Sequence, residues 1–214
     1  MHPTKRRLNP TCTSRFEEEI QRAGYARIAG VDEVGRGALC GPVMAAAVVL
    51  DARQIPDGID DSKKLSAAQR EALFAQIMST ALAVGVGRVE PEIIDQENIL
   101  QATLRAMTEA VRQLHPPADF LLIDALQLPW LELPQKSIIR GDAQSVSIAA
   151  ASIVAKVTRD RIMVKLDQQF PGYSLRRNKG YGTRAHLDSL RQFGPSPIHR
   201  KSFRPVAQMD FQFD

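Results

Sequence analysis

The chain has 214 residues, enough for one well-buried core or one core with a small appendage, and too few to require two full domains. It has no run of about 18 apolar residues and no signal-peptide pattern in its basic N-terminus, so a membrane span and export are not expected. Two cysteines exclude a disulfide framework and favour the reducing cytoplasm, and the net charge of +4 is modest.

A stretch of carboxylates and glycines follows the first predicted strand, which covers residues 28–31. Asp32 and Glu33 are adjacent at the end of this strand, and a Gly-Arg-Gly sequence comes directly after Val34. Carboxylates bind hard cations such as Mg²⁺ and Mn²⁺, glycines let the backbone approach a ligand closely, and arginine makes bidentate contacts with phosphate. The stretch therefore indicates phosphodiester chemistry, although an acidic, glycine-rich hairpin turn would have the same composition.

Asp32 and Glu33 can bind one cation only if the backbone departs from a regular strand there. Successive side chains of a strand point to opposite faces, so a regular strand would separate the two carboxylates. We expect the glycines that follow to permit a bend. A backbone carbonyl could also replace one of the two side chains as a ligand.

The remaining chain predicts an α/β protein. The first strand can pair with the β-branched run at residues 43–50 as a hairpin, and Ser66 with Gln69 forms a capping box. Strands and helices in this order predict a central mixed β-sheet flanked by helices, with a helical C-terminal region. Further strands are predicted over residues 82–89, 120–123 and 137–139, and helices over residues 66–80, 91–114, 145–166 and 185–193.

Two further acids occupy places where buried backbone meets a loop. Asp124 follows the apolar strand at residues 120–123, and Asp142 precedes the long helix, where it could be only a helix cap. Neighbouring strand ends lie about 5 Å apart, so acids on several strand ends can surround a pair of cations. Such a pair, roughly 3.5–4 Å apart, stabilises the attacking water and the leaving oxygen of an in-line phosphoryl displacement.

Basic residues gather near the C-terminus. Between residues 173 and 204 the only acid is Asp188. A cluster of this kind is typical of a nucleic-acid surface, and a solvated basic face without a partner is the alternative. The basic residues are Arg176, Arg177, Lys179, Arg184, Arg191, Arg200, Lys201 and Arg204.

Several long segments resemble the type 2 ribonucleases H, specifically ribonuclease HII. The resemblance implies an RNase H-like fold, hydrolysis of the RNA strand of RNA–DNA hybrids, and incision 5′ of single ribonucleotides embedded in duplex DNA. It also implies products with 5′-phosphate and 3′-hydroxyl ends and a requirement for Mn²⁺ or Mg²⁺. The matching segments are IAGVDEVGRGALCGPV at 28–43, DSKKLS at 61–66, LLIDAL at 121–126, IIRGDAQSVSIAAASIVAKVTRD at 138–160, NKGYGTRAH at 178–186 and HRKSF at 199–203.

The resemblance also assigns roles to individual residues. Asp32, Glu33, Asp124 and Asp142 match the four catalytic acids of the family, and the first three are expected to hold the metal. Backbone contacts near the ribonucleotide, a stacking contact at the RNA–DNA junction and phosphate contacts are the other implied roles. They fall in that order on Gly35, Arg36 and Gly37, on Tyr181, and on Ser62, Lys63 and Lys64. A close backbone suits recognition of a 2′-hydroxyl group, and phosphate contacts position a duplex without reading its sequence.

Two other functions remain open at this point. A resolvase-like DNA nuclease with an RNase H fold would share the acids and the metal, but it would not need the Gly-Arg-Gly element or Tyr181. A non-catalytic protein that binds hybrids would leave four carboxylates unpaired beside phosphate, which is electrostatically unfavourable without a metal. Cleavage of an all-DNA duplex would indicate the resolvase-like function.

The chain is expected to divide into a flexible basic arm over residues 1–22, a catalytic domain over residues 23–205 that includes C-terminal substrate-binding helices, and a tail over residues 206–214. In the tail, Gln208, Phe211 and Phe213 have the spacing of short peptides that dock on the replication sliding clamp. The alternative is a terminal segment that folds onto its own core. Nothing in the sequence requires more than a monomer.

Overall fold

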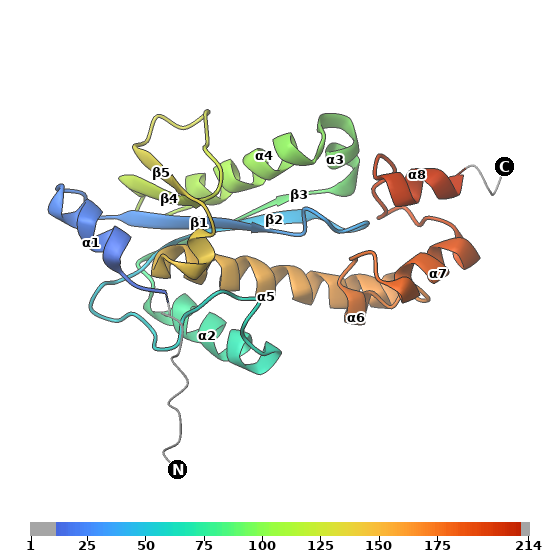
Figure 1. The fold of residues 1–214 in the computed structure, drawn as a ribbon, viewed down its shortest axis with the longest axis horizontal. Coiled ribbons are helices and arrows are strands. Elements are labelled where there is room, and N and C mark those ends of the chain that lie inside the picture. The colour runs from blue at the N-terminus through green and yellow to red at the C-terminus, as the bar shows by residue number, and fades with distance from the viewer. Residues whose placement is uncertain (1–11, 211–214) are drawn as a thin grey trace, which may run out of the picture.

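A mixed five-stranded sheet lies between helices on both of its faces (Figure 1). The computed structural model describes residues 12–210. The strand order is β3-β2-β1-β4-β5. The elements are α1 (Arg15–Arg22), β1 (Ile28–Val34), β2 (Val43–Val49), α2 (Ala67–Thr80), β3 (Ala83–Val89), α3 (Pro91–Glu97), α4 (Ile99–Arg112), β4 (Phe120–Asp124), β5 (Gln135–Ile138), the 3₁₀ turn η1 (Gly141–Ala143), α5 (Val146–Gln169), α6 (Leu175–Asn178), α7 (Arg184–Phe193) and α8 (Arg204–Asp210).

The sheet combines an antiparallel half with a parallel half. β1 pairs with β2 as the predicted hairpin, β2 pairs with β3 antiparallel, and β4 and β5 extend the sheet in parallel from β1. Every residue of β2 is buried, because helices cover both faces of this strand and a small or β-branched residue suits each side. The fold class predicted from the sequence is confirmed.

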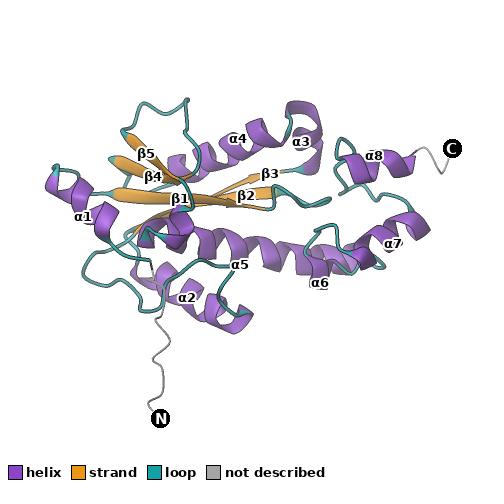
Figure 2. Cartoon of the chain, viewed as in Figure 1, coloured by secondary structure: helices purple, strands orange, loops and turns teal. Residues whose placement is uncertain are grey.

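Two hydrophobic cores hold the helices against the sheet. Val31, Ala45 and Ala47 pack on one face with α4, whereas Ala46 and Val48 pack on the other face with α5. α2 packs outside α5, α6 packs against the C-terminal half of α5, and α7 and α8 follow beyond that end of the sheet (Figures 1 and 2). The described part of the chain contains no helix long and apolar enough to cross a membrane.

Three segments differ from the sequence-based expectations. The helical region predicted over residues 91–114 is two helices, because Asn98 has a positive φ of 77° and its side chain caps α4 by accepting from the amides of Leu100 and Gln101. The arm expected over residues 1–22 is helical from Arg15 to Arg22. α8 runs across the boundary expected at residue 206, and Val206 is buried among the C-terminal helices.

Helix α1 is tied to the start of α5. Oε1 of the buried Glu17 accepts hydrogen bonds from the hydroxyl of Ser145 at 2.5 Å and from the amide and hydroxyl of Ser147 at 3.0 and 2.6 Å. A carboxylate in this position is favourable because the first amides of a helix lack intrahelical partners. This contact joins residues about 130 positions apart, so the local sequence pattern does not predict it.

Candidate active site

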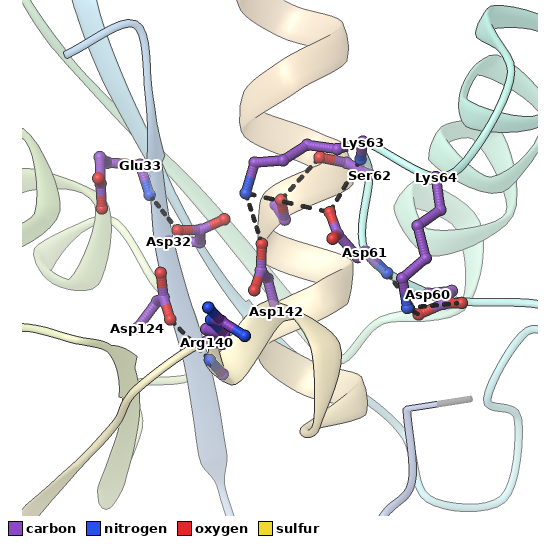
Figure 3. A network of polar contacts seen from close by, with 12 residues as sticks. Asp32, Glu33, Asp60, Asp61, Ser62, Lys63, Lys64, Asp124, Arg140 and Asp142 are labelled. Carbon is purple, nitrogen blue, oxygen red and sulfur yellow. Dashed lines mark hydrogen bonds and ion pairs between the residues drawn. The ribbon is translucent and has the colours of Figure 1, made fainter. Parts of the chain in front are cut away.

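Asp32 and Asp124 lie side by side at one edge of the sheet. β1 and β4 pair in parallel with Val31 opposite Ile123, so the next residue of each strand is an acid. Strands in a sheet are about 4.8 Å apart, which sets the spacing of the two backbones. Both side chains point to the α5 face, and Figure 3 shows their carboxylates turned toward each other. The strand-end acids predicted from the sequence are therefore brought together.

Glu33 points to the opposite face from Asp32. β1 stays regular through both residues, with Asp32 opposite Ala46 and Glu33 opposite Ala45 of β2. The bend expected between the two acids is therefore absent, because the hairpin pairing continues to Val34. The Glu33 carboxylate pairs with Arg36 at 3.3 Å. Glu33 still borders the site, since it lies at the open end of the sheet.

Asp142 reaches the same site from η1, the turn that precedes α5. The amide of Gly141 donates to Oδ1 of Asp124 at 2.6 Å, which fixes this turn against β4. The Lys63 ammonium group donates to Oδ2 of Asp142 at 2.7 Å (Figure 3). Asp142 therefore does more than cap a helix, and the actual N-cap of α5 is Ser145, whose hydroxyl accepts from the amide of Ile148.

Burial and mutual repulsion raise the pKa values of three of these acids. Burial raises the pKa of Asp32 well above its ordinary value, and the charges of Glu33 and Asp124 raise it further. Burial also raises the pKa of Glu33, against the lowering effect of Arg36, and it raises the pKa of Asp124 despite the Gly141 amide. The folded protein therefore holds negative charge where it is unfavourable.

These shifts predict a pH dependence of stability in the presence of a chelator. A carboxyl group whose folded pKa is raised contributes stability below its unfolded pKa, and that contribution is lost as pH rises through the folded pKa. We expect Asp124→Asn to melt above the wild type at about pH 8 with EDTA, and the difference to narrow toward about pH 4. Thermal unfolding across this range measures the effect. A difference that stays constant with pH would contradict it.

The residues of the site fit a divalent cation. Burial lowers the pKa of Lys63, but its hydrogen bond to Asp142 and the charges of Asp142, Asp61 and Asp32 outweigh this and raise it. The ammonium group thus occupies the acidic site as a cation would. Within residues 12–210 no three carboxylates bring oxygens within 4.8 Å of one another, a separation consistent with the repulsion that raises their pKa values. Carboxylate oxygens are the ligands that Mg²⁺ and Mn²⁺ prefer.

A cavity of about 320 Å³ opens beside these acids. The sequence did not indicate two of its polar lining residues, Ser152 and Lys156, which lie one helical turn apart on α5. Their i, i+4 spacing was the available signal, but the alanine-rich helix suggested only close packing. The complete lining is Asp32, Glu33, Val34, Ser62, Lys63, Ser152, Lys156 and Tyr181.

The structure separates the three predicted phosphate contacts. Lys63 contacts Asp142 with its ammonium group, although 77% of its side chain is exposed to solvent. Ser62 is buried and lines the cavity. Its hydroxyl lies 2.9 Å from the hydroxyl of Ser152, so it already has a hydrogen-bond partner. Lys64 points away and pairs with Asp60 at 3.1 Å (Figure 3). Lys64 is therefore the one member of this group that the structure does not place at the site.

The loop that begins with Gly35-Arg36-Gly37 and runs to residue 42 is held by two arginines from distant parts of the chain. Arg200 donates to the carbonyls of Arg36 at 2.9 Å and of Gly41 at 2.9 and 3.1 Å. Arg159 donates to the carbonyls of Pro42, Cys40 and Lys179. Both guanidinium groups are fully buried, and neither has an ion-pair partner within 4.0 Å among the described residues. A side chain at Gly35 would collide with Arg159, and its φ of +91° also favours glycine.

Burial of Arg200 corrects one expectation about the basic cluster. Arg200 was counted as part of a nucleic-acid surface, but it lies inside the protein, and burial lowers its pKa to about 9. Arg184 and Arg191 share Asp188 as an ion-pair partner. The exposed members therefore carry less free charge than the sequence count suggests.

Tyr181 stands at the rim of the cavity next to the Gly-Arg-Gly segment. It pairs with Ala38 as an isolated antiparallel bridge, and the amide of Leu39 donates to the carbonyl of Gly180 at 2.7 Å. The Arg159 guanidinium lies 5.5 Å from the centre of the Tyr181 ring. The backbone directly after the Gly-Arg-Gly segment is thus joined by hydrogen bonds to the backbone around Tyr181.

The sheet, with acids at the ends of β1 and β4, defines the RNase H-like class of proteins. The ribonuclease H2 from Pyrococcus horikoshii OT3 superposes with a TM-score of 0.75 at 26% identity, covering 88% of this chain and 99% of that chain. Ribonuclease HII from Archaeoglobus fulgidus, solved as a complex with PCNA, gives a TM-score of 0.72 at 25% identity, covering 85% of this chain and 96% of that chain.

Sequence comparison narrows the class to one family. The family model described as ribonuclease HII matches residues 29–206, and a ribonuclease HII from Geobacter metallireducens is 58% identical over 193 residues, which is 90% of this chain and 91% of that protein. The chain belongs to the ribonuclease HII family, and it is therefore an enzyme of the nuclease class.

Proposed function

We infer that this enzyme hydrolyses the RNA strand of RNA–DNA hybrids and cuts 5′ of single ribonucleotides embedded in duplex DNA. The observation that carries the proposal is the convergence of Asp32, Asp124 and Asp142, of which Asp32 lines the same cavity as Tyr181. Acids alone would suit any nuclease of this fold. Their position next to a backbone segment and an aromatic ring suits a substrate with a 2′-hydroxyl group at a defined place.

Each group has a role in the proposed reaction. Asp32 and Asp124 would hold Mg²⁺ or Mn²⁺ through their carboxylates, and Glu33, whose side chain points to the other face, would contribute its backbone carbonyl. Asp142 would complete the set of acids, with the Lys63 ammonium group as its partner. When bound, a pair of such ions supplies an activated water and neutralises the charge that develops on phosphorus. Water adds to phosphorus, and the bond from phosphorus to the 3′-oxygen of the preceding nucleotide breaks. This leaves a 3′-hydroxyl on the preceding nucleotide and a 5′-phosphate on the ribonucleotide.

Substrate recognition is assigned to residues around the cavity. Gly35, Arg36 and Gly37 bring the backbone close to the ribonucleotide, because no Cβ at the two glycines blocks the approach. Tyr181 stacks near the junction at which RNA is followed by DNA. Ser62 and Lys63 lie close enough to the acids to contact phosphate, whereas Lys64 can do so only by leaving Asp60.

The direct test uses a duplex with one embedded ribonucleotide, a full RNA–DNA hybrid and an all-DNA duplex. Each is incubated with Mg²⁺, with Mn²⁺ or with EDTA, and the product ends are mapped. We expect metal-dependent cleavage of the first two substrates only. Cleavage of all-DNA duplex at a comparable rate would replace this proposal with the resolvase-like function.

Gly37→Ala is expected to impair substrate use without weakening the fold. An added Cβ at Gly37 meets nothing within 4 Å in the free protein, so the melting temperature should be unchanged. If the backbone approaches the ribonucleotide here, the methyl group should lower kcat/KM on the single-ribonucleotide duplex by about tenfold, because a displaced substrate reacts poorly. Steady-state kinetics and thermal unfolding measure the two effects. Full activity would remove Gly37 from the recognition element.

A sliding clamp is the proposed protein partner. The relative from A. fulgidus was solved with PCNA, and Gln208 is exposed near the end of α8, while Phe211 and Phe213 lie outside the described residues. Deleting residues 208–214 should abolish binding to a bacterial clamp in a calorimetric titration and leave nuclease activity intact. Unchanged affinity of the shortened chain for the clamp would contradict this proposal.

A further inference from the structure

Two buried histidines form a chain of hydrogen bonds that ends at Tyr181. The Nδ1 atom of His199 accepts from the amide of Ser196 at 3.0 Å, so the neutral His199 ring carries its proton on Nε2. The two Nε2 atoms of His199 and His186 are 3.1 Å apart, so His199 donates and His186 accepts. His186 then carries its proton on Nδ1, which lies 3.0 Å from the carbonyl of Tyr181.

Every donor in this chain therefore has one acceptor, and the direction runs from Ser196 to Tyr181. Both rings are buried, and burial lowers the pKa of His199 to about 4 and also lowers that of His186. Both rings are thus neutral at pH 7, as the donor and acceptor assignment requires. A proton on either accepting nitrogen would remove one hydrogen bond of the series.

The two ends of this hydrogen-bond chain both contact the segment that directly follows Gly-Arg-Gly. Residues after this segment run between Tyr181 and the loop that carries His199: Ala38 bridges to Tyr181, and Cys40 bridges to His199. The amide of Gly41 donates to the carbonyl of Ile198, and that of Arg200 donates to the carbonyl of Leu39. The hydrogen bond between the two histidine rings links the loop that carries His199 to Tyr181 directly.

We propose that His186 and His199 are positioning residues: they fix the backbone of Tyr181 so that its ring is in place to stack on the RNA–DNA junction. This inference rests on the recognition role proposed for Tyr181. Neither histidine lines the cavity beside the acids, so they act through Tyr181 and not on the reacting phosphate.

A metal site is the competing explanation for the same atoms. The sulfur of Cys40 and one nitrogen of each histidine lie within 4.8 Å of one another. Two features of the surroundings oppose a cation. All four ring nitrogens already have protein partners, and the uncompensated charges of Arg159 and Arg200 act on Cys40. Burial raises the pKa of the Cys40 thiol to about 12, which disfavours the thiolate that a metal would need.

The test compares two substitutions at His199 that differ in which ring nitrogen they imitate. In His199→Gln the side-chain amide can replace the Nε2 donor to His186, whereas His199→Asn can replace only the Nδ1 acceptor for Ser196. The quantity measured is the ratio of kcat/KM on the single-ribonucleotide duplex to kcat/KM on the full hybrid. We expect the Asn variant to lower this ratio by roughly tenfold and the Gln variant to stay close to the wild type.

Further measurements separate positioning from loss of folding. The Asn substitution should lower the ratio no further in a Tyr181→Ala background, because both changes remove the same contact. Equal ratios in the wild type, the Gln variant and the Asn variant would overturn the inference. If the wild type cleaved neither substrate, the proposed function would fail, and the ring tautomers would still test the hydrogen-bond chain.

Those tautomers can be read by ¹⁵N NMR of histidine-labelled protein near pH 7. We expect His199 protonated on Nε2 and His186 on Nδ1. The opposite assignment, a charged ring, or one equivalent of zinc retained by the purified enzyme and lost in Cys40→Ala would each overturn the inference.

Discussion

Asp32→Asn should lower the cleavage rate strongly and at the same time make the metal-free protein more stable. Asp32 is buried, and its pKa is raised by burial and by the charges of two neighbouring carboxylates, Glu33 and Asp124. The neutral amide removes this repulsion while its oxygen can still accept from the amide of Glu33, as Asp32 does at 2.8 Å. Turnover should fall on the order of a thousandfold, the loss typical of removing one electrostatic group from a catalytic site.

The stability gain is the sharper half of this prediction. Because the amide removes a buried charge that its neighbours repel, we expect a melting temperature a few degrees above that of the wild type in EDTA at pH 8. Asp57→Asn, in an exposed loop, is the matched control and should change neither property. An Asp32→Asn protein that is less stable in EDTA, or that retains full turnover, would contradict the assignment of Asp32 to the site.

Gly30→Ala should lower the stability of the enzyme strongly, because the added methyl group meets the backbone of α5. A Cβ at Gly30 would lie 2.0 Å from the carbonyl carbon of Ser147 and 2.3 Å from the amide nitrogen of Ile148, both backbone atoms of α5. Because backbone cannot move aside as a side chain can, the first turn of α5 must shift. We expect a loss of about 3 kcal/mol and a melting temperature about 10 °C lower.

Gly37→Ala is the control for Gly30→Ala, because it adds the same methyl group where nothing lies within 4 Å. The two variants should show opposite effects: lower stability from the first, and lower activity without lower stability from the second. Chemical denaturation with a shared baseline compares them. Equal stabilities would mean that α5 does not approach β1 as closely as described.

The sequence predicted the parts of the fold that local pattern determines. The hairpin of β1 and β2, the capped helix α2 and the strand that ends at Asp124 follow from alternation, capping residues and apolar runs. The acids were identified because each follows or precedes a buried element. Their convergence needed the parallel register of β1 and β4, which joins residues about 90 positions apart and has no local signature.

Contacts between distant segments account for what the sequence did not reveal. Glu17 ties α1 to α5, so the helix at Arg15–Arg22 depends on a partner that sequence reading cannot supply. The bend expected after Asp32 does not occur, because pairing with β2 outweighs the flexibility of the glycines that follow. Arg200 was predicted to lie on the surface, because composition alone does not distinguish a solvated guanidinium group from one enclosed by carbonyl oxygens.

The two enclosed guanidinium groups have a consequence for how the enzyme meets a polyanion. Arg159 and Arg200 sit in a low-dielectric interior, where mobile counterions cannot gather around them as they do around lysines in solvent. Their field therefore persists at ionic strengths that cancel exposed charge. A duplex bound at the cavity would be attracted by these two charges beneath residues 35–42. Part of its binding affinity should therefore remain at high salt concentration.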